Sequence, residues 1–204
     1  YPPGEQSLVW QVAASQSGAA RVRISYVLGN LTKSFNYRAV AASDEKTLTL
    51  NQYMRLQNFA NEEFLSSFDA DKGANLWAGW GRHFTRPVGF NETKEMLVQK
   101  FTNVVIQKTY TCNPSEHGYL DRAQDKLRVP MHYVLKNDRA SHLGAGPLPF
   151  GKVRIFIAPK PGTSANQGST FLGEDWGTFT PLDDEMKLYL GVAQDIVVKR
   201  TIDR

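Results

Sequence analysis

Apolar side chains recur at every second position in most of the chain. Val153, Ile155 and Ile157 point one way in such a run, and Lys152, Arg154 and Phe156 point the other. A two-residue period is that of a β-strand, whose successive side chains lie on opposite faces of a sheet. Because residues 146–151 are rich in Pro and Gly, a turn should lead into this strand.

The last third of the chain, residues 126–204, continues in the same way. Further short runs at 171–176, 186–190 and 196–200 each end at Gly, Pro or Asp, which predicts a β-meander. Residues 127–135 also alternate, but Pro130 has no N–H to donate to a sheet. We therefore expect that strand to lie at a sheet edge or to carry a bulge.

The first part of the chain repeats this pattern. Alternating runs occupy 8–13, 20–27, 33–40 and 47–56, separated by turn-forming residues. Strands spaced by roughly ten residues are typical of antiparallel sandwiches or barrels and not of βαβ units. The expected fold is mainly β, an antiparallel β-sandwich that is immunoglobulin-like or related.

Two segments leave alternatives open. Residues 58–76 fit either a short helix near 60–70 or a loop followed by a strand, and residues 96–111 fit one long strand or two shorter ones. The polar residues that follow suggest either a single module over 1–204 or two sub-sandwiches, 1–112 and 126–204, joined by a loop at 113–125.

Composition narrows the class of protein. The 204 residues carry a net charge of +4, from 24 Lys and Arg against 20 Asp and Glu, and these charges are spread along the chain. A nucleic-acid binder usually concentrates its basic residues, so we expect no nucleic-acid partner.

Cys112 is the only cysteine, which excludes an intrachain disulfide and a cysteine-based zinc site. No apolar stretch is long enough to predict a transmembrane segment. The abrupt start at Tyr1, without an initiator Met, suggests a processed or fragmentary piece of a longer protein.

One motif resembles a phosphate-binding loop by spacing alone. Gly146, Gly151 and Lys152 have the P-loop interval, but that site needs backbone N–H donors, a hydroxyl for Mg²⁺ and a following helix. Two prolines, at 147 and 149, remove two of the donors, Val153 replaces the hydroxyl, and a strand is expected to follow. The sequence favours a turn here.

Other catalytic constellations are also weak. Acidic residues cluster at 174–175 and 183–185. Adjacent acidic residues in a turn are more simply interpreted as capping groups than as an acid–base catalytic pair. The four histidines form no closely spaced ligand pair, so no metal site is predicted; they are His83, His117, His132 and His142. We expect no enzyme and no cofactor.

An aromatic segment is the strongest candidate for a ligand site. Glycine-rich residues 77–90 place aromatic and basic side chains in an irregular loop, which suits a sugar-binding or peptide-binding surface. The competing interpretation is that Trp77 and Phe84 close the end of the sandwich. The candidate ligand-binding residues are Trp77, Trp80, Arg82, His83 and Phe84.

Several of these stretches together resemble a known family. The matching segments include Trp10 and residues 22–26, 35–37, 136–138, 147–154, 171–175, 190–191 and 195–198. They look like the C-terminal β-domain of mucoidy-inhibitor-A-like bacterial proteins, a domain family of unknown function. The resemblance implies a β-sandwich-type module, usually preceded by a smaller β-domain and a coiled coil, in proteins that often look exported. It supplies no agreed catalytic residues, and residues 77–119 depart from its pattern.

The expected function is therefore binding. We predict a non-enzymatic protein–protein interaction or assembly module of an exported bacterial protein, in the periplasm, associated with the outer membrane or at the cell surface. Its partner would be another protein or a second copy of the chain, held at an exposed strand edge. The alternative is a carbohydrate-binding module that uses the loop from Trp77 to Phe90.

Overall fold

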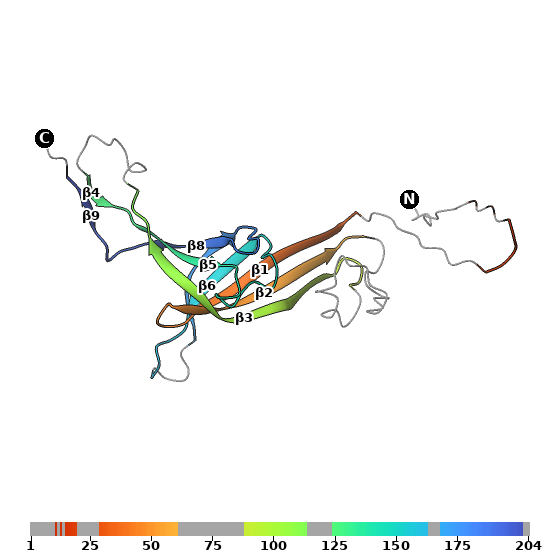
Figure 1. Ribbon diagram of the computed structural model, residues 1–204, viewed down its shortest axis with the longest axis horizontal. Coiled ribbons are helices and arrows are strands. Elements are labelled where there is room, and N and C mark those ends of the chain that lie inside the picture. Colours follow the sequence, from red (N-terminus) through yellow and green to blue (C-terminus); the bar gives the residue numbers. More distant parts are fainter. Residues whose placement is uncertain are drawn as a thin grey trace.

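The computed structural model describes residues 11, 13, 15–19, 29–60, 88–113, 124–162 and 168–201. All regular secondary structure in these residues is β, which confirms the mainly-β prediction (Figure 1). The strands are β1 (Leu31–Ala41), β2 (Thr47–Asn58), β3 (Thr93–Tyr110), β4 (Gln124–Leu127), β5 (Pro130–Lys136), β6 (Gly151–Ile157), β7 (Thr170–Gly177), β8 (Glu185–Val192) and β9 (Val198–Arg200). The helix suggested near 60–70 and the strand suggested over 20–27 lie outside the described residues.

Seven strands form one mixed sheet in the order β7-β6-β1-β2-β3-β5-β8. Only β1 and β6 pair in parallel, with Phe35 opposite Gly151 and Ala41 opposite Ile157. The chain makes this parallel pair by crossing the sheet from β5 to β6. Strands from before and after residue 113 therefore share one sheet.

The two end strands of this order come back together. The Tyr189 N–H of β8 donates a hydrogen bond of 2.7 Å to Asp175 Oδ2 of β7. Leu190 O lies 3.8 Å from the position that a Cβ on Gly173 would take. The sheet is thus nearly closed into a barrel, and the two stacked sheets of the expected sandwich are not distinguished. A carboxylate side chain bridges the seam where a ladder would have completed the barrel.

Alternation along each strand fills the barrel interior. On β1 and β6, Tyr37, Ala39, Val153 and Ile155 are almost fully buried. Other strands contribute Leu48, Leu50, Val104, Ile106, Tyr133, Leu135, Met186 and Leu188 to the same core cluster. Burying apolar side chains on one face of a sheet is the main stabilising contribution to such a fold.

Gly151 lets β6 approach β1 closely. A Cβ at this position would lie 2.4 Å from Phe35 O, which is too close for any other residue. Nearby, the Tyr37 hydroxyl donates to Pro149 O at 2.6 Å. Burial raises the pKa of Tyr37, so the hydroxyl keeps its proton and this donation persists.

Asn137 connects two loops at one end of the barrel. Its buried side chain donates to the carbonyl oxygens of Gly146, Thr180 and Pro181, each at 3.0 Å, and accepts from the Gly144 N–H. The bonds with Gly144 and Gly146 lie within the loop after β5, and those to Thr180 and Pro181 reach the loop after β7. The loops after β5 and after β7 are consequently fixed to one another.

Two sequence expectations about single strands are resolved. β3 is one long strand of 18 residues. β5 lies inside the sheet, between β3 and β8, so the expected edge position for the Pro130 strand was wrong. The β5–β8 pair has a register shift between Met131 and His132, close to Pro130. This agrees with the alternative prediction of a bulge in this strand.

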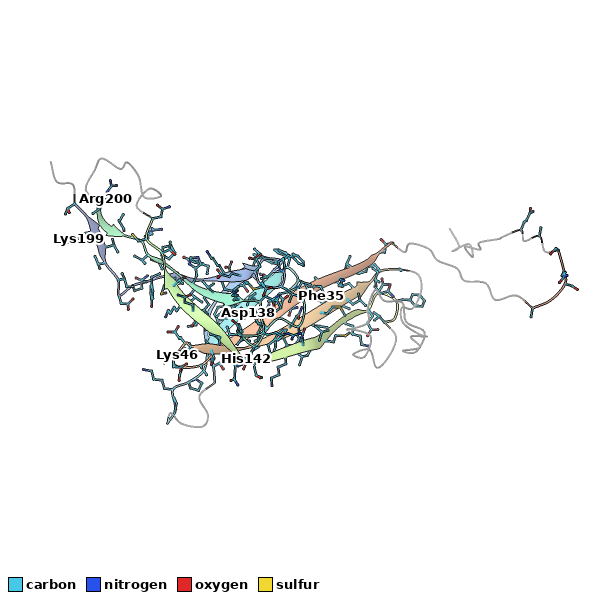
Figure 2. The ribbon with its side chains drawn as sticks, in the orientation of Figure 1. Phe35, Lys46, Asp138, His142, Lys199 and Arg200 are labelled. Carbon is cyan, nitrogen blue, oxygen red and sulfur yellow. The ribbon has the colours of Figure 1, made fainter. Side chains whose placement is uncertain are left out.

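Three strands run on beyond the barrel. β6 pairs with β1 only from Phe35 onward, and β5 pairs with β3 only over Ile106–Tyr110. The rest of β1, β2 and β3 therefore forms a three-stranded extension, which Figure 1 shows to the right of the barrel. At the opposite end, β4 and β9 form a separate two-stranded ribbon that carries Lys199 and Arg200 (Figure 2).

Candidate functional site

The predicted ligand-binding loop lies almost wholly outside the described residues. Trp77, Trp80, Arg82, His83 and Phe84 all belong to the part of the chain that the structure does not describe. From the same segment, Val88 is buried and its carbonyl accepts a hydrogen bond from Asn58. Phe90 is exposed in the following turn. The loop hypothesis therefore stays a prediction.

The outer face of the barrel brings together polar and aromatic side chains from four strands. The strand registers align Tyr53 of β2, Asn36 of β1, Lys152 of β6 and Trp176 of β7 in one cross-strand row. Directly opposed residues on one face of a sheet lie close enough to interact. This row crosses the sheet at right angles to the strands.

A second row lies beside the first and is more highly charged. It contains Asn51, Arg38, Arg154 and Glu174, again from β2, β1, β6 and β7. The Arg38 guanidinium lies 4.9 Å from the centroid of the Phe156 ring. Basic residues that are dispersed in the sequence thus become neighbours on one face of the molecule.

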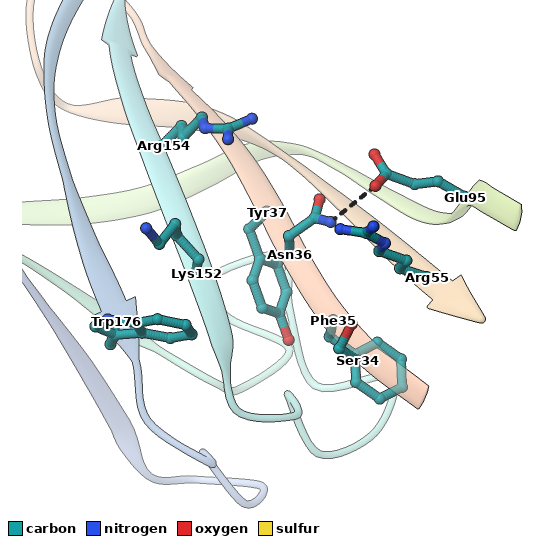
Figure 3. Close-up of a pocket in the computed structure, with 9 residues that line it drawn as sticks. All are labelled: Ser34, Phe35, Asn36, Tyr37, Arg55, Glu95, Lys152, Arg154 and Trp176. Atoms are coloured by element: carbon teal, nitrogen blue, oxygen red, sulfur yellow. Dashed lines mark hydrogen bonds between the residues drawn. The ribbon is translucent and has the colours of Figure 1, made fainter. Parts of the chain in front are cut away.

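Four members of these rows, Asn36, Lys152, Trp176 and Arg154, line a groove on the outer surface of β1. Its volume is about 270 Å³. Figure 3 shows Lys152 and Trp176 on one side of β1, and Arg55 and Glu95 on the other. The full lining is Ser34, Phe35, Asn36, Tyr37, Arg55, Glu95, Lys152, Arg154 and Trp176.

A polar pair joins the floor of the groove, at Asn36, to the wall that carries Glu95. Asn36 Nδ2 donates a hydrogen bond of 3.3 Å to Glu95 Oε2, drawn as the dashed line in Figure 3. The Glu95 carboxylate retains further acceptor sites, and the Asn36 carbonyl oxygen is an acceptor as well. The pair therefore offers hydrogen-bonding groups that suit hydroxyls.

Lys152 is held in place on the opposite wall. Its ammonium donates to Glu174 Oε1 at 2.9 Å and lies 5.3 Å from the Trp176 ring centroid. The hydrogen bond from Lys152 and its charge lower the pKa of Glu174, with a smaller contribution from Arg154. Trp176 stacks on Phe150, with ring centroids 5.1 Å apart and planes inclined by 2°. Both rings are more than half exposed, at 53% for Trp176 and 56% for Phe150.

A second feature is the edge of β3. Over residues 93–102 no described strand pairs with β3 on the side away from β2. Next to this stretch, Val105 N donates to Ser141 O at 3.2 Å and His142 Nδ1 lies 2.7 Å from Asn103 O. Figure 2 shows His142 near Lys46 at this end of the barrel. The turn after β5 thus covers the edge only from Asn103 onward.

A partly buried charge cluster lies at the turn between β1 and β2. Lys108 Nζ donates to both Glu45 oxygens, at 2.9 and 2.8 Å, and the Tyr133 hydroxyl donates to Glu45 Oε1 at 2.5 Å. Burial alone would raise the pKa of Glu45, but the bonds from Lys108 and Tyr133 outweigh it and lower that pKa. Because these groups connect the turn to β3 and β5 and satisfy one another, we interpret the cluster as structural.

The remaining polar candidates do not converge. His132 is half-buried with its ring 5.5 Å from that of Tyr189, and His142 lies in an exposed turn. Within the described ranges, no three His, Cys, Asp or Glu side chains gather as a metal-binding group. In the same residues no helix long and apolar enough to cross a membrane occurs.

Sequence reasoning missed the groove, although part of its signal was present. The alternation in residues 152–157 correctly placed Lys152 and Arg154 opposite the apolar side chains. What the sequence lacked was the parallel pairing of β1 with β6, which brings Asn36 and Arg38 beside those cations. Comparisons with family models, with curated proteins and with solved structures find no match for this chain.

Proposed function

We propose that the protein is a non-enzymatic interaction module that holds an extended segment of a partner polypeptide along the edge of β3. One observation supports this proposal above the others: residues 93–102 of β3 lack a neighbouring strand among those described. The backbone N–H and C=O groups on such an edge are ready to pair with another chain.

The other strand edges are less available. β7 and β8, which end the sheet order, lie against each other through the bond between Tyr189 and Asp175. β4 and β9 pair with one another in a short ribbon. The β3 edge is therefore the longest unpaired edge among the described strands.

The side chains beside this edge suit a partner strand of mixed character. Leu97 is exposed at 43%, and Glu95 and Lys100 are exposed next to it. A partner strand with an apolar side chain opposite Leu97 and an acidic one opposite Lys100 would pair favourably across the ladder. Lysines on an edge strand also discourage unselective aggregation.

The resemblance to mucoidy-inhibitor-A-like bacterial proteins supports a setting for this role. Under the proposal the chain is part of an exported bacterial protein, in the periplasm or at the cell surface, and its partner is another protein of that compartment. The partner could equally be a second copy of the chain, and a mass measurement distinguishes the two cases.

Site-specific photo-crosslinking tests the proposal. A benzoylphenylalanine at position 97 should crosslink to the partner, whereas the same residue at Leu182, which is also exposed but lies between β7 and β8, should not. The purified partner should then slow amide hydrogen exchange in residues 93–102. Equal crosslinking from both positions, or protection confined to other strands, would contradict the proposal.

Light scattering after size-exclusion chromatography gives the second readout. A dimer with crosslinks between two copies of position 97 would identify self-association at the same edge. A monomer that crosslinks to nothing in its native source would rule out the β3 edge as the interaction surface.

A further inference from the structure

We propose that the groove over β1 binds an acidic oligosaccharide, with one carboxylated pyranose ring seated between Trp176 and Glu95. This site lies on the outer face of the sheet and is built from β1, β2, β6 and β7 as well as β3, with which it shares Glu95. The inference does not depend on the strand-addition proposal.

Electrostatics favour an anionic ligand. The lining contains three cations, Arg55, Lys152 and Arg154, against one carboxylate, Glu95. Glu174 lies next to the groove and forms ion pairs with Lys152 at 2.9 Å and with Arg154 at 3.8 Å. The guanidinium of Arg55 stands on the other side of β1 (Figure 3). A carboxylate over β1 would therefore meet positive charge from both walls.

The polar floor favours a sugar over a simple polyanion. Glu95 accepts a hydrogen bond from Asn36 and can accept another from a ligand hydroxyl. A phosphate or sulfate placed at the same point would be repelled by this carboxylate. Ser34 adds a hydroxyl that both donates and accepts. The combination fits a ligand with hydroxyls on one side and an acid group on the other.

The aromatic wall offers an apolar contact to a pyranose ring. Trp176 is exposed by 53%, Phe150 stacks on it and Lys152 Nζ lies 5.3 Å from its ring centroid, so a sugar would contact the exposed remainder of the indole. A rigid exposed aromatic side chain provides contact area at a low cost in conformational entropy. The volume of about 270 Å³ accommodates one sugar ring with its substituents.

Isothermal titration of the whole chain with a tetramer of galacturonic acid tests the inference. The methyl ester of the same tetramer keeps the hydroxyls and removes the charge, so its binding should be lost or reduced. Arg154→Gln should weaken binding of the acid by about threefold or more, since a partly exposed ion pair contributes modestly. Arg128→Gln, at an exposed position between β4 and β5, is the matched control and should bind as the wild type does.

Asn36→Leu separates a sugar site from a general polyanion surface, because it removes a hydrogen-bonding group and changes no charge. If hydroxyls bind at the Asn36–Glu95 pair, this variant should bind the acid tetramer more weakly than the wild type. If the groove attracts any polyanion by charge alone, binding should be unchanged, and that result would overturn the inference. Tighter binding of an oligothymidylate than of the tetramer would do so too, because it would assign the face to single-stranded nucleic acid. Finding no heat of binding at millimolar tetramer, with the fold intact by circular dichroism, is the third contrary outcome.

Discussion

The inner and outer faces of the β1–β6 pair differ sharply, although alternate residues of the same two strands form them. Side chains on the inner face, such as Ala39 and Ile155, have no exposed surface and pack in the core of the barrel. Their immediate neighbours on the outer face, Arg38 and Arg154, are exposed, and Arg154 lines the groove. Stability thus depends on the inner face, while the proposed ligand site lies on the outer face, and single substitutions can separate the two.

Truncation on the inner face should have the largest effect. Ile155→Ala removes fully buried carbons from the parallel pair, and Ile→Ala changes in cores typically lower the free energy of unfolding by about 3 kcal/mol. Urea denaturation measures the loss. A change below about 1 kcal/mol would show that the interior of the barrel is loosely packed at β6.

Adding a single methyl group where β1 and β6 meet should be nearly as damaging. Gly151→Ala places a Cβ 2.4 Å from Phe35 O, so the strands must separate, and a loss of about 2 kcal/mol is expected from such overpacking. Gly146→Ala is the matched control, because nothing lies within 4 Å of its Cβ position. Equal unfolding midpoints for the two variants would contradict the close approach of the strands.

The contacts of Glu45 with Lys108 and Tyr133 should make the stability of the barrel depend on pH. The folded-state pKa of Glu45 is lowered, so its contribution is present above the unfolded value near 4.5 and is lost as pH falls through the folded value. Lys108 has a raised pKa, because its bonds to Glu45 outweigh the lowering by burial, so its contribution is lost only at strongly alkaline pH.

Glu45→Gln should therefore cost about 1 kcal/mol at pH 7, since the ion pair is partly exposed, and the deficit should shrink toward pH 3. Denaturation of wild type and variant at pH 7, 5 and 3 measures it. Asp44→Asn, in the same turn but outside the pair, is a suitable control. A deficit that stays constant down to pH 3 would show that charge is not the cause.

Substitution on the outer face should have the smallest effect on stability. Arg154→Gln alters an exposed side chain whose ion pair with Glu174 is 3.8 Å long, so the free energy of unfolding should stay within about 0.5 kcal/mol of the wild type. Comparison with Ile155→Ala by the same urea titration gives the contrast between adjacent residues. A large loss in Arg154→Gln would mean that the outer face also holds the fold together.

Much of the strand content was predictable, and the reason is local. Each of β1, β2, β6, β7 and β8 overlaps a run of alternating residues, because a half-buried strand imposes a period of two on its own sequence. The helix near 60–70 and the aromatic residues from Trp77 to Phe84 remain predictions, since they fall outside the described part of the chain.

The arrangement of the strands was not predictable in the same way. Pro130 suggested an edge strand, yet β5 lies inside the sheet because only its first residue lacks the N–H. Register and neighbour choice depend on pairing between segments far apart in sequence, which local periodicity does not encode.

By itself the sequence determined that this protein is built from strands, and which side chains of each strand face the same way, because both follow from the alternation of side chains along an extended backbone. Only the tertiary structure decided that one mixed sheet nearly closes on itself. It also decided that β1 lies beside β6 and that Asn36, Arg55, Glu95, Lys152, Arg154 and Trp176 border one groove. The β1 residues of the groove lie more than a hundred positions before those of β6, and it is packing of the shared core that selects this pairing.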